Sequence, residues 1–279
     1  MPQSNLSDEY KVLIEENFGC TKILAEGDSW LAYPRQFLFY GAEANITDHL
    51  AYHDDLAIFN TASNGDEAVA MLSGEQKFSL IKSLMEFEFD YLLFSGGGND
   101  VVGRYDFDFF IRNKEDGFDW EDCIRKDRVG LKIDQIDSAY RTLCELTTEY
   151  SSNPNITIIT HTYERLTPID EGFALFDLIP LGKAWLHPFM VKKNIADPDD
   201  QRRIVGFILN EFKNALFGVA NDYGVGRVYE TERDTNRALF NVVDTWDTVL
   251  AGEWRNEIHP TSDGFEKVAQ KIYDEQIAE

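Results

Sequence analysis

Five short apolar runs, each bounded by turn residues or by charge, alternate along the chain with longer stretches of helical periodicity. Runs of this kind are typical of strands buried on both faces. Strands that alternate with helices predict a parallel sheet covered by helices on both sides. We therefore predict an α/β fold with a five-stranded parallel sheet, with strands at Lys22–Ala25, Leu56–Asn60, Tyr91–Phe94, Ile156–Thr160 and Gly226–Tyr229.

The stretches between these runs carry apolar residues at the spacing of one helix face. Helices are expected at Glu67–Leu72, Gln76–Phe87, Asp134–Tyr150, Asp199–Ala220 and Ser262–Ile277. Two connections, residues 101–128 and 161–198, exceed the usual loop length and are rich in aromatic residues. A chain of 279 residues without a linker or repeat is therefore predicted to form one domain, residues 1–279, that carries these two insertions.

The charge balance argues against polyanionic partners. The chain has 26 basic and 50 acidic residues, a formal net charge of −24. Such a surface repels phosphate backbones and anionic lipid headgroups, so nucleic-acid and membrane binding are not expected. The simplest interpretation is a solvated acidic surface that aids solubility.

The sequence offers no metal or disulfide pattern. Its cysteines, Cys20, Cys123 and Cys144, form no C-x-x-C pair, and no Asp-rich calcium loop occurs. The amino-terminal residues are polar and acidic, unlike a signal peptide, and no apolar run reaches membrane-spanning length. We expect a cytoplasmic protein without a metal or cofactor, and oligomeric state is not indicated.

Two polar motifs follow predicted strands directly. Gly27-Asp28-Ser29-Trp30 follows the first strand, and Gly97-Gly98-Asn99-Asp100 follows the third. Ligand sites in parallel sheets form at the carboxyl ends of strands, so both motifs are expected on one rim. A serine hydroxyl there can act as a nucleophile once a base takes its proton, and an asparagine amide can donate to an oxyanion. Taken alone, each motif is equally compatible with an ordinary turn.

Histidines supply the candidate base. His259 precedes Pro260, so it is expected to be extended, just before the last predicted helix. His161 directly follows the fourth strand and is expected either in a substrate pocket or behind it. Burial or a helix end would explain either histidine without any catalytic role.

The combination of motifs resembles the SGNH (GDSL-type) hydrolase family over nearly the whole chain. The residues that carry the resemblance are Gly27-Asp28-Ser29, Gly65, Gly97-Gly98-Asn99-Asp100 and His259. The resemblance implies a flavodoxin-like three-layer α/β/α fold and ester hydrolysis without a metal or organic cofactor. It also implies that Ser29 is the nucleophile and His259 the base. The oxyanion hole would comprise the backbone N–H groups of Ser29 and Gly65 and the side chain of Asn99.

One position departs from the family's pattern. The family usually has an aspartate three residues before the histidine, and this chain has Asn256. An asparagine oxygen can accept from the histidine Nδ1–H, but it supplies no negative charge to an imidazolium. Glu257, Glu253 and Asp247 are the acids nearby in sequence, and the sequence does not choose among them. Activity should rise as His259 loses its proton, near the ordinary histidine pKa of about 6.5.

These residues predict a serine ester hydrolase that acts on small or medium carboxylic esters through an acyl-enzyme. Trp30, His161, Trp185 and Phe189 are expected near the substrate, although core packing would explain the aromatic residues equally well. Two alternatives stay open, a metal-dependent phosphoesterase and a non-catalytic binding module on a hydrolase scaffold. The natural ester is not indicated.

Overall fold

The computed structural model describes residues 3–33, 44–170, 174–175, 179–180, 184–226, 233–234 and 236–278. Within them, six parallel strands form one sheet in the order β1-β3-β2-β4-β5-β8. The strands are β1 (Gln3–Ser4), β2 (Thr21–Gly27), β3 (Leu56–Asn60), β4 (Tyr91–Ser95), β5 (Thr157–His161) and β8 (Phe240–Val243). If β1 is set aside, the remaining order is 2-1-3-4-5, which is the order of flavodoxin-like sheets.

The predicted α/β fold and four of its five strands are confirmed, but the strand count and the last strand are wrong. The two-residue strand β1 adds an edge beside β3. The place beside β5 belongs to β8, Phe240–Val243. Of the predicted strand Gly226–Tyr229, Gly226 lies in a turn and residues 227–229 lie outside the described residues. Strand β8 escaped prediction because half-buried Asn241 interrupts its short apolar run.

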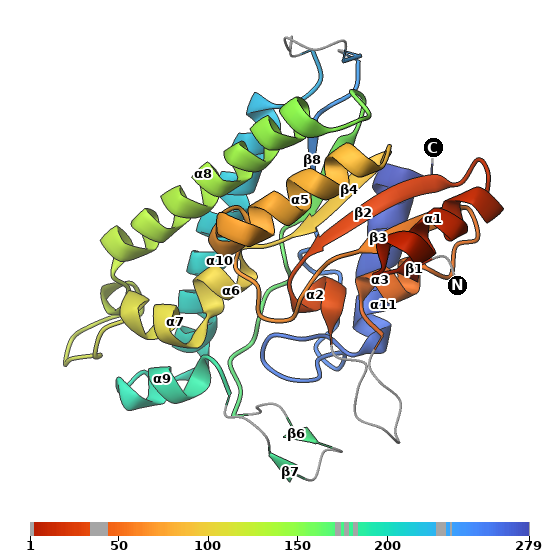
Figure 1. The fold of residues 1–279 in the computed structure, drawn as a ribbon. Coiled ribbons are helices and arrows are strands. Elements are labelled where there is room, and N and C mark those ends of the chain that lie inside the picture. The colour runs from red at the N-terminus through yellow and green to blue at the C-terminus, as the bar shows by residue number, and fades with distance from the viewer. Residues whose placement is uncertain are drawn as a thin grey trace.

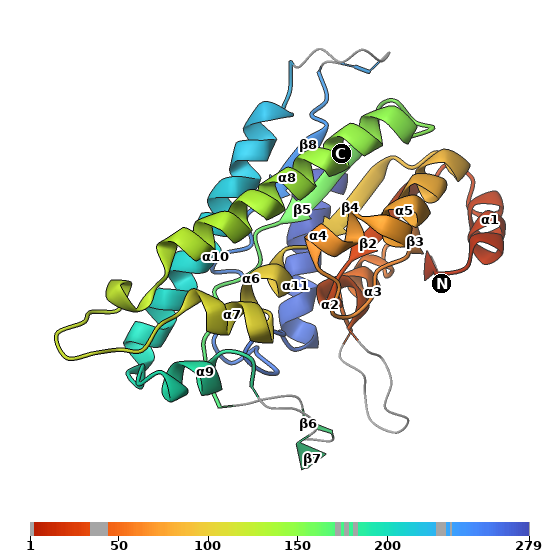
Figure 2. The ribbon, with the colours of Figure 1, turned by 60° about the vertical axis from the view of Figure 1, so that its left-hand side comes forward.

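Helices cover the sheet in two layers (Figures 1 and 2). On one side lie α5 (Gly74–Glu86) and α8 (Lys126–Tyr150), and α10 (Pro198–Asp222) packs against α8. On the other side, α3 (Ile46–Leu50) packs against α11 (Ser262–Ile272). Helix α1 (Ser7–Glu16) lies beside β1 and β3. Because both faces are covered, the interior of β4 and β5 is completely buried.

The predicted helices all exist, with shifted ends. Helix α8 begins at Lys126 rather than Asp134, because buried Val129 extends its apolar stripe by two turns. The last predicted helix changes at Tyr273 from α to a π turn, Tyr273–Ile277. Helix α4 (Ala68–Met71) precedes α5. No helix among the described residues is long and apolar enough to cross a membrane.

The two predicted insertions contain short elements of their own. The first holds the end of α6 (Gly98–Val102), α7 (Arg104–Phe110) and a 3-10 turn (Glu121–Cys123), closed by an antiparallel bridge between Ile111 and Ile124. The second holds the pair β6 (Ala174–Leu175) and β7 (Ile179–Pro180), followed by α9 (His187–Lys192). Both insertions lie at the end of the molecule that holds the carboxyl ends of the strands (Figure 1).

Candidate active site

The loops that follow β2, β3 and β4 are hydrogen-bonded side by side. The Asp28 N–H donates to the Ser95 carbonyl at 2.9 Å, and the Ser63 N–H donates to the Gly27 carbonyl at 2.8 Å. A Cβ at Gly27 would lie 2.4 Å from the Ser95 carbonyl oxygen, so only glycine allows this approach. The first and third motifs therefore share one rim, where their strands end.

Ser29 is the first residue of the short helix α2 (Ser29–Ala32). Asp28 caps this helix by accepting from the Trp30 N–H at 3.0 Å. His259 comes from the loop before α11, and its Nε2 lies 2.7 Å from the Ser29 Oγ. The Asn256 Oδ1 lies 3.1 Å from the His259 Nδ1. All three residues are buried, and together they form a Ser–His–Asn chain.

The orientation of the Asn256 amide fixes the histidine tautomer. The Asn256 Oδ1 also accepts from the backbone N–H groups of Ile258 and His259, both at 3.0 Å. Because two backbone donors face this atom, it must be the oxygen, and Nδ1 of His259 must carry the proton. The His259 Nε2 is then free of hydrogen and accepts from the Ser29 hydroxyl. An asparagine can therefore select the tautomer that general-base catalysis needs.

The nearby acids do not replace the missing triad carboxylate. The Glu257 carboxylate accepts from backbone groups of the second insertion, Glu253 pairs with Lys267, and Asp247 lies 3.5 Å from Arg165 on the surface. Burial alone lowers the pKa of His259, to about 3. Because the value near 6.5 assumed an exposed imidazole, burial moves the expected acid limb to lower pH.

Replacing Asn256 by aspartate should move the pH dependence of the reaction. A carboxylate in contact with Nδ1 stabilises the imidazolium, so the pKa of His259 should rise by about 1–3 units. The acid limb of kcat/KM should move upward by the same amount, and this is measured on a p-nitrophenyl ester in matched buffers. Burial raises the pKa of Asp28 to about 6 in both proteins, which would mask in the rate profile a shift of His259 below that value, so the His259 imidazole is also titrated by NMR. An unchanged imidazole titration would contradict the role given to Asn256.

A buried polar network supports Ser29 from behind. Asp28 accepts from the Ser95 hydroxyl at 3.0 Å through Oδ1 and from the Tyr163 hydroxyl through Oδ2. The Tyr163 N–H donates to the His161 Nδ1 at 3.3 Å, so the His161 Nε2 carries the proton and donates to the Ser95 Oγ at 2.9 Å. Ser95 and His161 are completely buried, so this second Ser–His pair holds the Asp28 turn rather than meeting a substrate.

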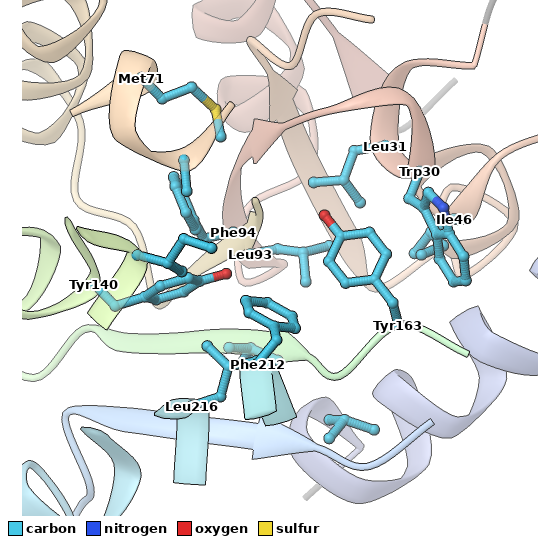
Figure 3. Packing of buried hydrophobic residues seen from close by; sticks show 14 of the residues in the cluster. Trp30, Leu31, Ile46, Met71, Leu93, Phe94, Tyr140, Tyr163, Phe212 and Leu216 are labelled. Atoms are coloured by element: carbon cyan, nitrogen blue, oxygen red, sulfur yellow. The ribbon is translucent and has the colours of Figure 1, made fainter. Parts of the chain in front are cut away.

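Tyr163 is held in an unusual backbone conformation within this network. Its φ of 55° lies in the left-handed region, which non-glycine residues seldom occupy. Its ring packs edge-on against Trp30, with centroids 5.0 Å apart, and at a tilt against Phe212, with centroids 5.8 Å apart. Figure 3 shows Tyr163 between these two rings. Strain of this kind persists only where surrounding contacts impose it, and here the Asp28 bond and the two rings do so.

The four residues expected near the substrate occupy different places. Trp30 lines the cavity beside Ser29, and its Nε1–H donates to the Ile258 carbonyl at 3.2 Å. His161 stacks on the Trp30 ring at 5.2 Å and lies behind the cavity. The Trp185 ring stands edge-on to His259 at 6.0 Å. Phe189 is half-buried in α9 and packs against the core.

Two of the expected oxyanion donors, Asn99 and Gly65, differ in position and in exposure. Asn99 lines the same cavity as Ser29 and His259, and its Nδ2 donates to the Asp66 carbonyl at 2.9 Å. Gly65 adjoins Asp66 on the loop after β3 and is exposed, with a φ of 91°. The Asn99 bond therefore ties the third motif to the loop that carries Gly65.

Two buried glutamates, which the sequence did not single out as anchors, hold the loops around the site. The Glu257 carboxylate accepts from the backbone N–H groups of Ile169, Leu186 and His187 at 3.3, 2.9 and 2.8 Å, and also from that of Trp185. Glu164, just after β5, accepts in the same way from residues 247–249. Each carboxylate thus gathers the backbone of a distant loop. Nothing in the sequence around a glutamate distinguishes such a buried anchor from an exposed carboxylate.

No family model and no curated protein matches the sequence. Solved structures do resemble it. A lipase from a goat rumen metagenome superposes with a TM-score of 0.51 over 91% of this chain and 96% of its own, at 14% identity. An extracellular lipase from Streptomyces rimosus and a phospholipase A1 from Streptomyces albidoflavus also reach 0.51, each at 12% identity over 91% of this chain and 99% of their own.

The chain has the fold of these lipases. Its structural neighbours are lipases and esterases of the SGNH type, as the sequence motifs had indicated. At 12–14% identity the likeness concerns the fold alone. The Ser–His–Asn chain and the loops that surround it are therefore the evidence for chemistry.

Proposed function

We propose that this chain is a serine ester hydrolase of the SGNH type that acts through an acyl-enzyme. The observation that carries the proposal is the contact of 2.7 Å between the His259 Nε2 and the Ser29 Oγ, with the tautomer of His259 fixed by Asn256. A serine hydroxyl beside a correctly protonated imidazole, which is itself oriented by a third group, is the arrangement of an activated nucleophile. The fold supports the proposal, because these residues occupy the carboxyl-end rim of the sheet.

The reaction would proceed in two balanced halves. His259 removes the Ser29 proton while Oγ attacks the ester carbonyl, and the resulting oxyanion is stabilised by the Ser29 N–H and the Asn99 amide. The tetrahedral intermediate collapses, His259 gives the proton to the leaving alkoxide, and an acyl-serine remains. Water, deprotonated by His259, then attacks the acyl group, and the proton returns to Ser29 as the carboxylic acid leaves. The Gly65 N–H is the third proposed oxyanion donor.

Burial of His259 has a cost in this cycle. The imidazolium forms in an apolar setting without a neighbouring carboxylate, which makes His259 a weak base with a low pKa. Because of this low pKa, His259 is fully deprotonated at neutral pH and ready to accept the Ser29 proton. We therefore propose a hydrolase whose rate is constant between pH 7 and 8 and falls only on the acid side.

Replacing Asn99 by alanine tests the oxyanion assignment. Loss of one oxyanion donor should lower kcat by about 10²–10³ with little change in KM, because the donor acts on charge that develops in the transition state. The measurement is steady-state hydrolysis of p-nitrophenyl acetate. Asn99→Asp serves as the matched variant of equal size, which cannot donate and should be at least as slow. A kcat within threefold of wild type in both variants would remove Asn99 from the oxyanion hole.

The proposal is separated from its alternatives by one labelling experiment. A fluorophosphonate reacts with an activated serine, so a live hydrolase should be labelled at Ser29, whereas a non-catalytic binding module should not. A metal-dependent phosphoesterase would instead release phosphate and lose activity in EDTA. Labelling at Ser29 together with ester hydrolysis in EDTA is the expected result.

A further inference from the structure

The cavity beside Ser29 is narrow. It measures about 20 Å³, which is room for roughly one water molecule. Its polar lining comes from Asp28, Ser29, Asn99 and His259, and the rest of its lining is largely apolar. Besides Trp30 and Ile258, this apolar wall includes Gly98, Val102, Tyr163, Leu166 and Leu209.

The geometry of the proposed reaction assigns this wall to the acyl group. The leaving oxygen must face the His259 Nε2, because His259 protonates it. The Tyr33 and Trp185 rings lie next to the imidazole, with their centroids 4.6 and 6.0 Å from its centroid. The acyl chain, on the opposite bond of the carbonyl carbon, is then directed away from His259, which leaves the apolar lining, including Val102 and Leu209, to receive it.

The wall belongs to the core and cannot withdraw easily. Val102 lies on α6 and is 4% exposed, and Leu209 lies on α10 and is 1% exposed. A Cβ at Gly98 would lie 2.7 Å from the Tyr163 ring, so these two residues already touch. Tyr163 is in turn fixed by its hydrogen bond to Asp28. Close-packed interiors of this kind resist the addition of even one methylene group.

We propose, on the basis of the ester hydrolase function above, that the site selects acetyl esters and that Leu209, Val102 and Leu166 set this limit. An acetyl methyl group has about the size of the water molecule that the cavity accommodates. A butanoyl group adds two methylenes, which would have to enter the space of the Leu209 side chain. The aromatic residues of the second insertion, Trp185 and Phe189, do not form this wall.

The test compares p-nitrophenyl acetate, butanoate and octanoate. One methylene in a fitted apolar pocket changes discrimination about 10-fold or more, so wild type should prefer acetate over butanoate by at least about 10-fold in kcat/KM. Leu209→Ala should lower this ratio by about 10-fold, chiefly by a gain on butanoate. Leu166 lies on the loop after β5. Leu166→Ala should shift the acetate-to-butanoate ratio in the same direction, and it is less prone to misfold than Leu209→Ala.

Leu216→Ala is the matched control. Leu216 lies on the same helix, is also 1% exposed, and packs in the core near Phe212 (Figure 3), but it does not line the cavity. It should destabilise the protein like Leu209→Ala and leave the acetate-to-butanoate ratio unchanged. Wild-type hydrolysis of octanoate as fast as acetate, or an equal shift in Leu216→Ala, would overturn the acetyl limit alone. Absence of hydrolysis of every ester, without fluorophosphonate labelling of Ser29, would overturn the hydrolase function and this inference with it.

Discussion

Alanine at Ser29 should reduce kcat on p-nitrophenyl acetate by about 10⁶-fold, to the background of a protein without a nucleophile. The side chain is 4% exposed, and its hydroxyl contacts the His259 Nε2 at 2.7 Å. Loss of this oxygen removes the acyl-enzyme route entirely, whereas the cavity and the proposed oxyanion donors remain. KM should therefore change little, and the melting temperature should stay close to that of wild type.

Ser95→Ala is the matched control for this experiment, because Ser95 is a second serine near the site that contacts a histidine. Its Oγ lies 2.9 Å from the His161 Nε2, but the residue is completely buried. Ser95→Ala should be less stable and slower, since the Asp28 turn loses a donor, yet Ser29 should still react with a fluorophosphonate. The account would fail if Ser29→Ala kept its turnover or if Ser95→Ala abolished labelling.

Glu257→Ala should lower the free energy of unfolding by at least about 3 kcal/mol. The carboxylate is 1% exposed and accepts from four backbone N–H groups, at residues 169 and 185–187. Each buried donor left without an acceptor costs about 1–3 kcal/mol of stability. Water that enters the vacated space would accept some of these hydrogen bonds and offset part of that loss. Urea unfolding measures the effect as a lower midpoint at constant slope.

Two further variants provide comparisons for the loss of stability in Glu257→Ala. Glu257→Gln keeps one acceptor oxygen and should lose less than half as much stability. Glu253→Ala removes a carboxylate from the same loop, but that carboxylate is 18% exposed and pairs with Lys267, so it should cost no more than about 1 kcal/mol. Equal losses in Glu257→Ala and Glu253→Ala would show that Glu257 does not anchor the second insertion.

The sequence predicted those parts of the structure that depend on local pattern. The strands β2 to β5 are apolar runs between turn residues, and the turns after β2 and β4 contain the glycines that close packing requires. Because parallel strands present their carboxyl ends at one rim, the pairing of Ser29 with Asn99 could also be foreseen. The prediction that His259 lies beside Ser29 came from the family resemblance in motif order and not from a local sequence pattern.

The remainder depends on contacts between distant residues. Strand β8 is stabilised by pairing with β5, although its own sequence, with Asn241 inside, is a weak strand signal. The hydrogen bond from Tyr163 to Asp28 joins residues 135 positions apart. The four donors to Glu257 likewise lie 70 to 88 positions away. The pKa of His259 depends on burial, which the sequence around it does not encode.

The central claim, an acyl group carried by Ser29, is tested most directly by trapping it. The protein is mixed with p-nitrophenyl acetate, quenched in acid within one turnover and digested for peptide mass spectrometry. The account predicts up to one acetyl group per chain on the peptide that contains Ser29, and none in His259→Ala. Turnover of the ester with no acetyl group on Ser29, or with the acetyl group on another residue, would contradict it.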